Sequence, residues 1–206
     1  MTQFETLDDK QAKLPPRERI LAAAGDLFYH HGIKAVGVDR IAEAAGTNKM
    51  TLYRHFASKD DLVGEYLRRL AANEGAKCCD LERLHPGDPR AQLSAWLAEM
   101  ARHVACADER GCPLANAAIE LAEKDHPARR VIEECKVAQR GWLIELCRRA
   151  QLAEPESLAD ELFLILEGAR VIAQSMGPEG TGARLVRMGE VLIAARGPRP
   201  GDDGAA

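Results

Sequence analysis

The stretch that most constrains the fold is residues 38–56, VDRIAEAAGTNKMTLYRHF. Its first half repeats apolar residues at the i, i+3, i+4 and i+7 spacing of a single helix face. Gly46 can adopt the left-handed conformation found just beyond a helix end, and Asn48 can cap a new helix with its side-chain oxygen. The apolar face is formed by Val38, Ile41, Ala42 and Ala45.

A second short helix is predicted from Lys49 to Phe56, because Leu52 and Phe56 lie one turn apart on the same face. Its other face is polar and basic. Two short helices joined by a turn of about three to four residues form a helix-turn-helix, in which the first helix holds the second rigidly. The polar face consists of Lys49, Thr51, Arg54 and His55.

The composition favours helices over strands. Hydrophobic residues make up 46% of the 206 residues and aromatic residues only 4%, and much of the hydrophobic share is alanine and leucine, which favour helices. The six cysteines contain no C-x-x-C pair, the chain starts with no charged-then-apolar leader, and no apolar run approaches the ~20 residues of a membrane span. We therefore expect an all-α protein with reduced thiols, located in the cytoplasm.

Charge is distributed unevenly along the chain. The formal net charge is −4, yet residues 10–59 hold nine lysines and arginines against four acidic residues. The excess of +5 in this segment leaves −9 for the remainder. A basic N-terminal segment, here called the head, followed by an acidic remainder, the body, indicates that the head binds phosphate and the body does not.

Proline, glycine and serine divide the rest of the chain into further helices. Pro15 and Pro16 open a helix that Gly32 ends, and Ser58 caps the helix that follows the helix-turn-helix. The segment HPGDP at 85–89 breaks the chain, and five more helical stretches follow. The predicted organisation is a flexible arm at 1–14, a helix-turn-helix domain at 15–62, a larger helical domain at 63–196 and a disordered tail at 197–206.

The segment from residue 17 to residue 66 resembles the DNA-binding domain of the TetR/AcrR family of bacterial transcription regulators. One departure is Val36-Gly37 at the start of the second helix, where the family commonly has Thr or Ser and a hydroxyl contact to phosphate. In the larger domain, GCPLANAA at 111–118 followed by His126-Pro127 is similar to a pattern shared by one subgroup. The matching segments of the head are 20–28 with Gly32, 41–46, 51–56 and 59–62.

This resemblance implies nine helices, a homodimer and a ligand cavity in each subunit. It also implies a repressor that binds a near-palindromic operator in double-stranded DNA and is released from it by a small apolar or aromatic effector. Lys49, Thr51 and Arg54 are expected to reach base edges or nearby phosphates. Positions that touch the phosphate backbone in the family are matched by Tyr53, His55 and Lys59. The effector, the operator sequence, the regulated genes and the choice between repression and activation stay open.

Residues 158–172 are apolar on nearly every side, so a helix here is expected to bury two faces, one of them against a second copy of the chain. Two copies would also place two recognition helices in successive major grooves, ~34–36 Å apart. The residues predicted at this dimer interface, a four-helix bundle with the last helix, are Leu162, Ile165, Leu166, Leu185, Met188 and Leu192.

A ligand pocket is predicted among the fifth to eighth helices of the chain, with an apolar lining and a few polar groups. The alternative is that the two tryptophans are simply core residues. The predicted lining residues are Trp96, Met100, His103, Asn116, Trp142 and Leu146.

Cys112 precedes Pro113 at a predicted helix start, which favours a reactive thiol and makes it a candidate redox or electrophile sensor, although most such cysteines are small buried residues. The spacing of His103, Cys106 and Cys112 matches no defined metal site, and no cofactor is predicted. A cysteine-dependent enzyme is a remote alternative, because no oxyanion hole or orienting acid is evident. An adaptor without DNA binding is countered by the basic helix.

Overall fold

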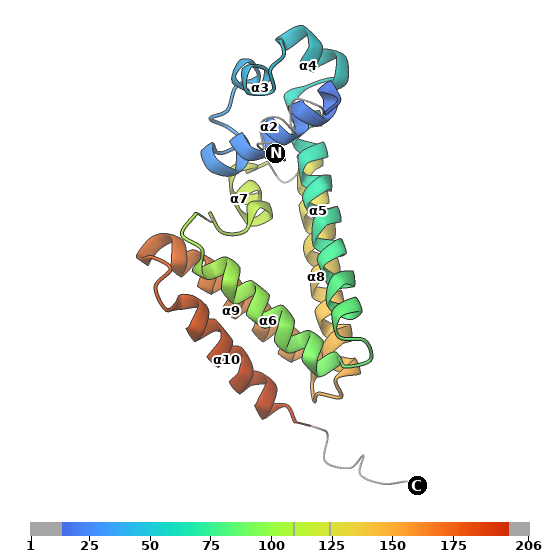
Figure 1. Cartoon of the computed structure of the whole chain (residues 1–206), viewed down its shortest axis with the longest axis vertical. Helices are drawn as coiled ribbons and strands as arrows, with labels where there is room; N and C mark the ends of the chain where they lie inside the picture. The colour runs from blue at the N-terminus through green and yellow to red at the C-terminus, as the bar shows by residue number, and fades with distance from the viewer. Residues whose placement is uncertain (1–13, 109, 124, 198–206) are drawn as a thin grey trace, which may run out of the picture. The chain divides into compact units, whose positions relative to one another are not determined.

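The computed structural model describes residues 14–108, 110–123 and 125–197 of the chain. These residues form nine α-helices and no strand, so the predicted all-α fold is confirmed (Figure 1). The ends of the predicted arm and tail, 1–13 and 198–206, lie outside the described residues. The helices are α2 (Pro16–His31), α3 (Val38–Ala44), α4 (Lys49–His55), α5 (Lys59–Leu84), α6 (Pro89–Ala105), α7 (Pro113–Glu120), α8 (Pro127–Arg149), α9 (Pro155–Met176) and α10 (Thr181–Ala195).

The chain divides into two compact units, and each is described by itself. The head unit comprises residues 14–71 together with Pro113–Ile132, and the body unit comprises Ala72–Cys112 together with 133–197. This division differs from the predicted domain limits of 15–62 and 63–196. Helix α5 continues without a break past residue 62, and α7 packs with the head although it is distant in sequence.

The turn between α3 and α4 is formed as the sequence predicts. Gly46 has φ +60°, and the N–H groups of Gly46 and Thr47 donate to the carbonyls of Glu43 and Ala42, both at 2.9 Å. This is the Schellman arrangement that closes a helix end. Asn48 then accepts the N–H of Thr51 on its side-chain oxygen at 2.9 Å, so α4 begins with a capped first turn.

The head core holds α4 against α2 and α3. Leu52 and Phe56 are almost fully buried, and the Arg17 guanidinium lies 5.1 Å from the centre of the Phe56 ring. Arg17 also donates to Glu65 on α5 at 2.8 Å. Helix α5 starts where Ser58 accepts the N–H of Asp61 at 3.0 Å, as predicted. Burial of Leu52 and Phe56 therefore fixes which face of α4 points into the head core.

Helix α7 joins the head through polar contacts as well as apolar ones. The Glu120 carboxylate accepts the backbone N–H of Lys34 at 3.0 Å, just after Gly32 ends α2. Gly32 has φ +87°, and a Cβ there would lie 3.0 Å from a Glu120 carboxylate oxygen. Glycine therefore serves two purposes at this position, since it permits the left-handed backbone and leaves room for Glu120.

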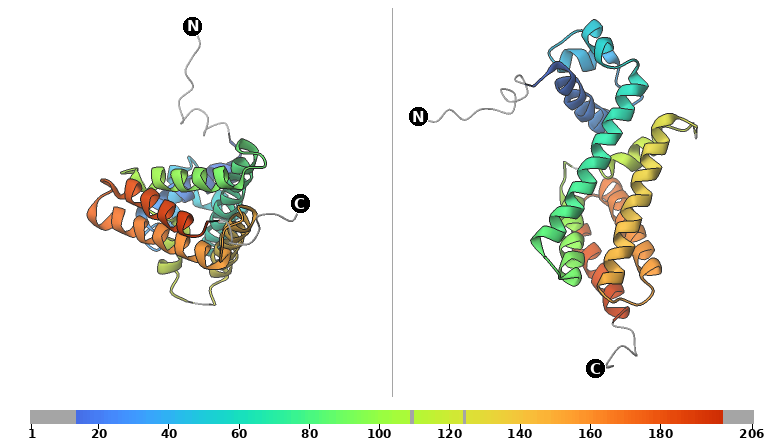
Figure 2. Two further views of the ribbon diagram at one scale, coloured as in Figure 1. Left: turned by 90° about the horizontal axis from the view of Figure 1, so that it is seen from below. Right: turned by 90° about the vertical axis from the view of Figure 1, so that its right-hand side faces the viewer.

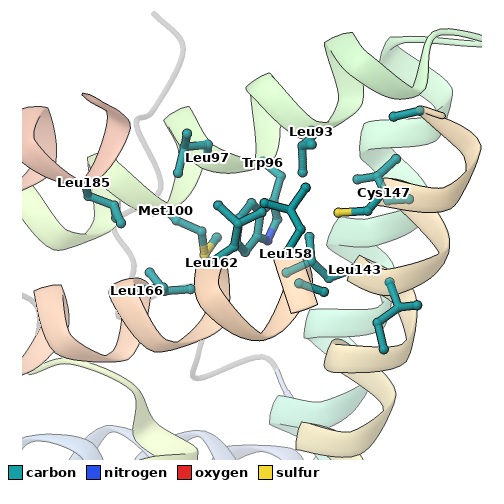
Figure 3. Packing of buried hydrophobic residues seen from close by; sticks show 14 of the residues in the cluster. Leu93, Trp96, Leu97, Met100, Leu143, Cys147, Leu158, Leu162, Leu166 and Leu185 are labelled. Carbon is teal, nitrogen blue, oxygen red and sulfur yellow. The ribbon is translucent and has the colours of Figure 1, made fainter. Parts of the chain in front are cut away.

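The body unit is a layered helical bundle in which α6, α9 and α10 run alongside one another (Figure 2, left). Leucines from α6, α8, α9 and α10 meet in one core, and Trp96 and Met100 of α6 point toward α9 (Figure 3). Helix α10 approaches α6 very closely at Gly182, where a Cβ would lie 2.5 Å from the Ala101 carbonyl oxygen. The small residues of α10 therefore set how tightly these two helices pack.

Helix α9 does not bury two faces within the subunit. One stripe is buried: Leu158, Ala159, Leu162, Leu166 and Ala169. The opposite side exposes apolar residues, among them Leu164 and Val171. The apolar character that the sequence shows on nearly every side of 158–172 thus divides into a core face and an exposed face.

Candidate functional site

The polar face of α4 is an exposed surface on a rigid helix. Lys49, Tyr53, Arg54 and His55 are exposed, whereas Thr51 and, at the start of α5, Lys59 are partly buried. The six residues predicted to contact DNA thus all lie on α4 or at the first position of α5. Tyr53 is 45% exposed, so it does not belong to the head core.

Two of the basic side chains near α4 have acidic neighbours. The Lys49 ammonium lies 3.2 Å from an Asp39 carboxylate oxygen on α3, and both side chains are more than half exposed. Such a surface pair contributes only about 0–1 kcal/mol, so phosphate can replace Asp39 at little cost. Near Lys59, Asp61 accepts the Ala57 N–H at 3.1 Å, and two backbone N–H groups at this helix start are already bonded.

Met50 is a surface residue of α4 that sequence reasoning did not select. It follows Lys49 and is 78% exposed. A methionine there can contact a thymine methyl group in the major groove. The sequence could have indicated that Met50 faces outward, because it does not lie on the apolar helix face that Leu52 and Phe56 define.

The body unit contains a cavity of about 250 Å³ between α5, α6, α8 and α9. Its walls are mainly apolar and aromatic, and several charged side chains lie at its edges. Figure 3 shows four of the lining residues, Trp96, Met100, Leu143 and Leu166, in the surrounding core. The other lining residues are Glu74, Lys77, Cys78, Asp80, Leu81, Leu84, Glu99, Gln139, Trp142, Phe163 and Arg170.

The six predicted ligand residues separate into two groups. Trp96, Met100 and Trp142 line the cavity. His103 lies further along α6 and Leu146 is 1% exposed within the core, and neither belongs to the lining. Asn116 lies on α7 in the head unit and is not among the lining residues.

Sequence reasoning missed the residues that α5 and α9 contribute to this cavity. Phe163 and Arg170 come from α9, and Glu74 and Cys78 come from α5. Arg170 could have been noticed, because it is the only arginine or lysine within the apolar run that forms α9. Burial and the nearby Glu74 raise the pKa of the Cys78 thiol to about 11, so this cysteine stays protonated at neutral pH.

Cys112 is a buried residue with a charged neighbour. It is 7% exposed and directly precedes α7. The Lys136 ammonium donates to its sulfur at 3.3 Å and to Glu167 at 2.7 Å. The metal alternative finds no support in the described ranges, where no three His, Cys, Asp or Glu side chains are placed to hold an ion.

Three of the six predicted dimer-interface residues require a correction. Leu162, Leu166 and Leu185 are at most 3% exposed inside the chain's own core, so they do not present surface to another chain. A sequence that is apolar on nearly every side could not distinguish the inner from the outer face of α9. The side chains that α9 and α10 do expose are Leu164, Val171, Ile172, Met176, Met188 and Val191, and Ile165 and Leu192 are partly buried.

No helix in the described part of the chain is both long enough and apolar enough to cross a membrane.

Comparison with known proteins assigns the head to a family. Residues 20–66 match the family model described as bacterial regulatory proteins, tetR family. The HTH-type transcriptional regulator LmrA of Bacillus subtilis is 30% identical over 135 residues, which cover 61% of this chain and 66% of LmrA. The HTH-type transcriptional repressor KstR2 of Rhodococcus jostii is 43% identical over 61 residues, which cover 30% of either chain. The chain thus spans less than two thirds of the length of these curated relatives.

Solved structures extend the likeness to the body. A TetR-family transcriptional regulator from Streptomyces coelicolor superposes with a TM-score of 0.83 at 26% identity, over 88% of this chain and 95% of that one. A tetR-type regulator from Streptomyces avermitilis gives a TM-score of 0.77 at 29% identity, over 89% and 98% of the two chains. The matching head, the shared helical fold and these sequence identities together show that the chain belongs to the TetR family of bacterial regulatory proteins.

Proposed function

We propose that this protein is a sequence-specific DNA-binding transcription regulator, and most specifically a repressor that a small molecule releases from its operator. The observation that carries the proposal is the surface of α4. A capped helix fixed by buried Leu52 and Phe56 presents Lys49, Tyr53 and Arg54 to solvent. A rigid basic helix of this kind fits the major groove, where arginine can donate to both acceptors of a guanine.

The proposed active form is a homodimer on a near-palindromic site. A single head offers one recognition helix, whereas two related half-sites about 34–36 Å apart require two. The exposed apolar side chains of α9 and α10 support this assembly, because an exposed apolar surface of this kind marks an interaction site. Met188 and Val191 on α10 and Leu164 and Val171 on α9 are the residues that we assign to the interface.

The proposed effector site is the body cavity lined by Trp96, Met100 and Trp142. An effector releases DNA only if it binds more tightly to the conformation in which the recognition helices are wrongly spaced. Helix α5 provides a covalent route for such coupling, since it carries Lys59 at one end and lines the cavity with residues such as Cys78 further along.

Selection of bound sequences from a random DNA library tests the proposal. The full chain should enrich a near-palindrome whose half-sites repeat at one helical turn, and sedimentation should give a dimer at working concentration. Enrichment of no consensus sequence, or a monomer that binds DNA as well as any larger species, would contradict it.

A second candidate, a redox- or electrophile-responsive regulator of the same fold, is favoured by one observation. The Lys136 ammonium 3.3 Å from the Cys112 sulfur is the kind of cationic neighbour found beside reactive cysteines. Burial raises the pKa of the Cys135 and Cys147 thiols, which makes both poor competitors. Under this candidate, hydrogen peroxide releases DNA from the wild type and not from Cys112→Ser. Equal behaviour of the two proteins would dismiss it.

A further inference from the structure

We propose that the body cavity takes an amphipathic anion, that is, a carboxylate carried on a small aromatic or aliphatic body, with Arg170 as its partner. The inference rests on the proposed function in one respect, that this cavity is the effector site. It adds the sign of the ligand's charge and the residue that recognises it.

The first step is an excess of positive charge beside the cavity. Arg170 and Lys136 both donate to the same oxygen of Glu167, each at 2.7 Å. The side chains of Arg170 and Lys136 are 18% and 21% exposed. Two largely buried cations therefore share a single carboxylate. Because charges interact more strongly away from water, a second anion close to Arg170 is favourable here.

The second step is the weak acceptor that one arm of Arg170 now meets. While Nη1 donates to Glu167, Nη2 lies 3.7 Å from the Met100 sulfur, which is also part of the cavity wall. A thioether is a weak acceptor, whereas a carboxylate forms short charge-assisted hydrogen bonds with a guanidinium. A ligand oxygen that replaces this sulfur contact thus gains a strong hydrogen bond at a donor that the fold already positions.

The third step concerns the acidic residues of the lining. There are three of them, and each already has a basic neighbour on the same helix, one turn away. A cationic ligand would have to share a carboxylate whose charge is already balanced, and a neutral ligand leaves the excess charge at Arg170 in place. The pairs are Glu74 with Lys77, Asp80 with Arg83, and Glu99 with Arg102.

The remainder of the lining defines the body of the ligand. Trp96 and Trp142 provide flat aromatic walls, Phe163 adds a third ring, and Leu81 and Leu84 are aliphatic. These groups can bury apolar area of a ligand. Apart from the indole N–H groups, they cannot form hydrogen bonds with further polar atoms of that ligand. The cavity thus suits a molecule with one anionic end and an apolar remainder.

Three matched compounds test the sign of the charge. We would titrate the full chain with 4-phenylbutyrate, 4-phenyl-1-butanol and 4-phenylbutylamine by calorimetry. The three share one aromatic body and differ only in the terminal group. The carboxylate should bind about tenfold more tightly than the alcohol or the amine, the size expected of one charge-assisted pair. Preference for the amine or the alcohol, or binding by none of the three, overturns the inference.

Variants test the role of Arg170. Arg170→Gln should remove the preference for the carboxylate. Arg170→Lys keeps the charge but loses the paired N–H donors of the guanidinium, so it should retain part of the preference. The matched control is Arg102→Gln, which removes a positive charge next to lining residue Glu99 from a side chain outside the lining. A preference that survives in Arg170→Gln, or that is lost equally in Arg102→Gln, contradicts the assignment. If Arg170→Gln does not fold, the wild-type and Arg170→Lys titrations still decide.

A separate DNA-binding measurement distinguishes the two levels of the proposal. If the wild type binds its operator but shows no carboxylate preference, the proposed function stands and the anion site is refuted. If the chain prefers the carboxylate through Arg170 but binds no specific DNA, the anion site stands and the proposed function is refuted.

Discussion

Individual side chains on α4 and α5 have different tasks in the proposed complex. Arg54 is exposed in the last turn of α4, where we propose that its guanidinium reaches a base edge, whereas Lys59 starts α5, where we propose that its ammonium meets phosphate. Base contacts give sequence preference, and phosphate contacts give affinity on any sequence.

Arg54→Ala and Lys59→Ala should both weaken operator binding, but only the first should relax base preference. Loss of a base contact costs about 1–3 kcal/mol on the preferred sequence, while loss of one phosphate contact lowers the salt slope by about 1 on all sequences. Anisotropy titrations on operator and random DNA measure both. Equal losses on the two DNAs for both variants would sink the assignment.

Glu65 predicts a pH effect on the stability of the head. The Arg17 hydrogen bond, assisted by the charges of Arg68 and Arg17, lowers the pKa of this carboxyl from its ordinary value of 4.5, although partial burial opposes the shift. A lowered folded-state pKa means that the ionised group stabilises the fold above the unfolded pKa. This contribution is lost as the pH falls through the folded-state pKa.

Glu65→Gln should therefore melt about 1–3 °C below the wild type at neutral pH, the size expected of a surface ion pair. The difference should vanish at a pH acidic enough to protonate the wild-type carboxyl in the folded state as well. Thermal unfolding at the two pH values provides the test. A difference that grows on acidification has the wrong sign for this account.

Arg170 shows why part of the candidate site could not be predicted at the residue scale. A lone arginine on an apolar helix can be recognised in the sequence, but Lys136, which shares Glu167 with it, and Met100 lie 34 and 70 positions away. Local periodicity carries no information about such contacts. The DNA-contact residues were easier, because all of them lie within one short motif.

At the scale of helices, proline, glycine and capping residues made the boundaries predictable. Helices α6, α8 and α9 each begin at a proline, and α2 and α9 each end before a glycine with positive φ. Which face of a uniformly apolar helix points inward was not predictable, and the incorrect placement of Leu162 at a dimer interface follows from this. The packing of α7 with the head depends on Glu120 and Lys34, which no local pattern connects.

The contact between α10 and α6 supplies a prediction about an element. Gly182→Ala should destabilise the body by about 1–3 kcal/mol, because the added Cβ meets the Ala101 backbone oxygen, which cannot rotate away. Gly141 on α8 is exposed, and a Cβ there meets nothing within 4 Å. Gly141→Ala is therefore the matched control and should stabilise by up to about 1 kcal/mol. Chemical denaturation that gives the same change for both variants would refute the close approach.

Across the whole molecule, we propose that the head recognises DNA and that the body binds the effector. The distribution of charge fits this division, since residues 10–59 are basic while the chain as a whole carries −4. An acidic protein can bind DNA when its positive charge is gathered at the binding surface. The consequence is that affinity should depend strongly on salt.

A mobility-shift titration with the DNA immediately upstream of the gene that encodes this chain tests whether the protein binds DNA sequence-specifically. We expect a shift that excess random DNA does not abolish, with two chains per site. Affinity should fall by about tenfold or more between 50 and 200 mM salt. A shift that random DNA competes away equally, or no shift at low salt, would contradict the claim that this protein is a sequence-specific regulator.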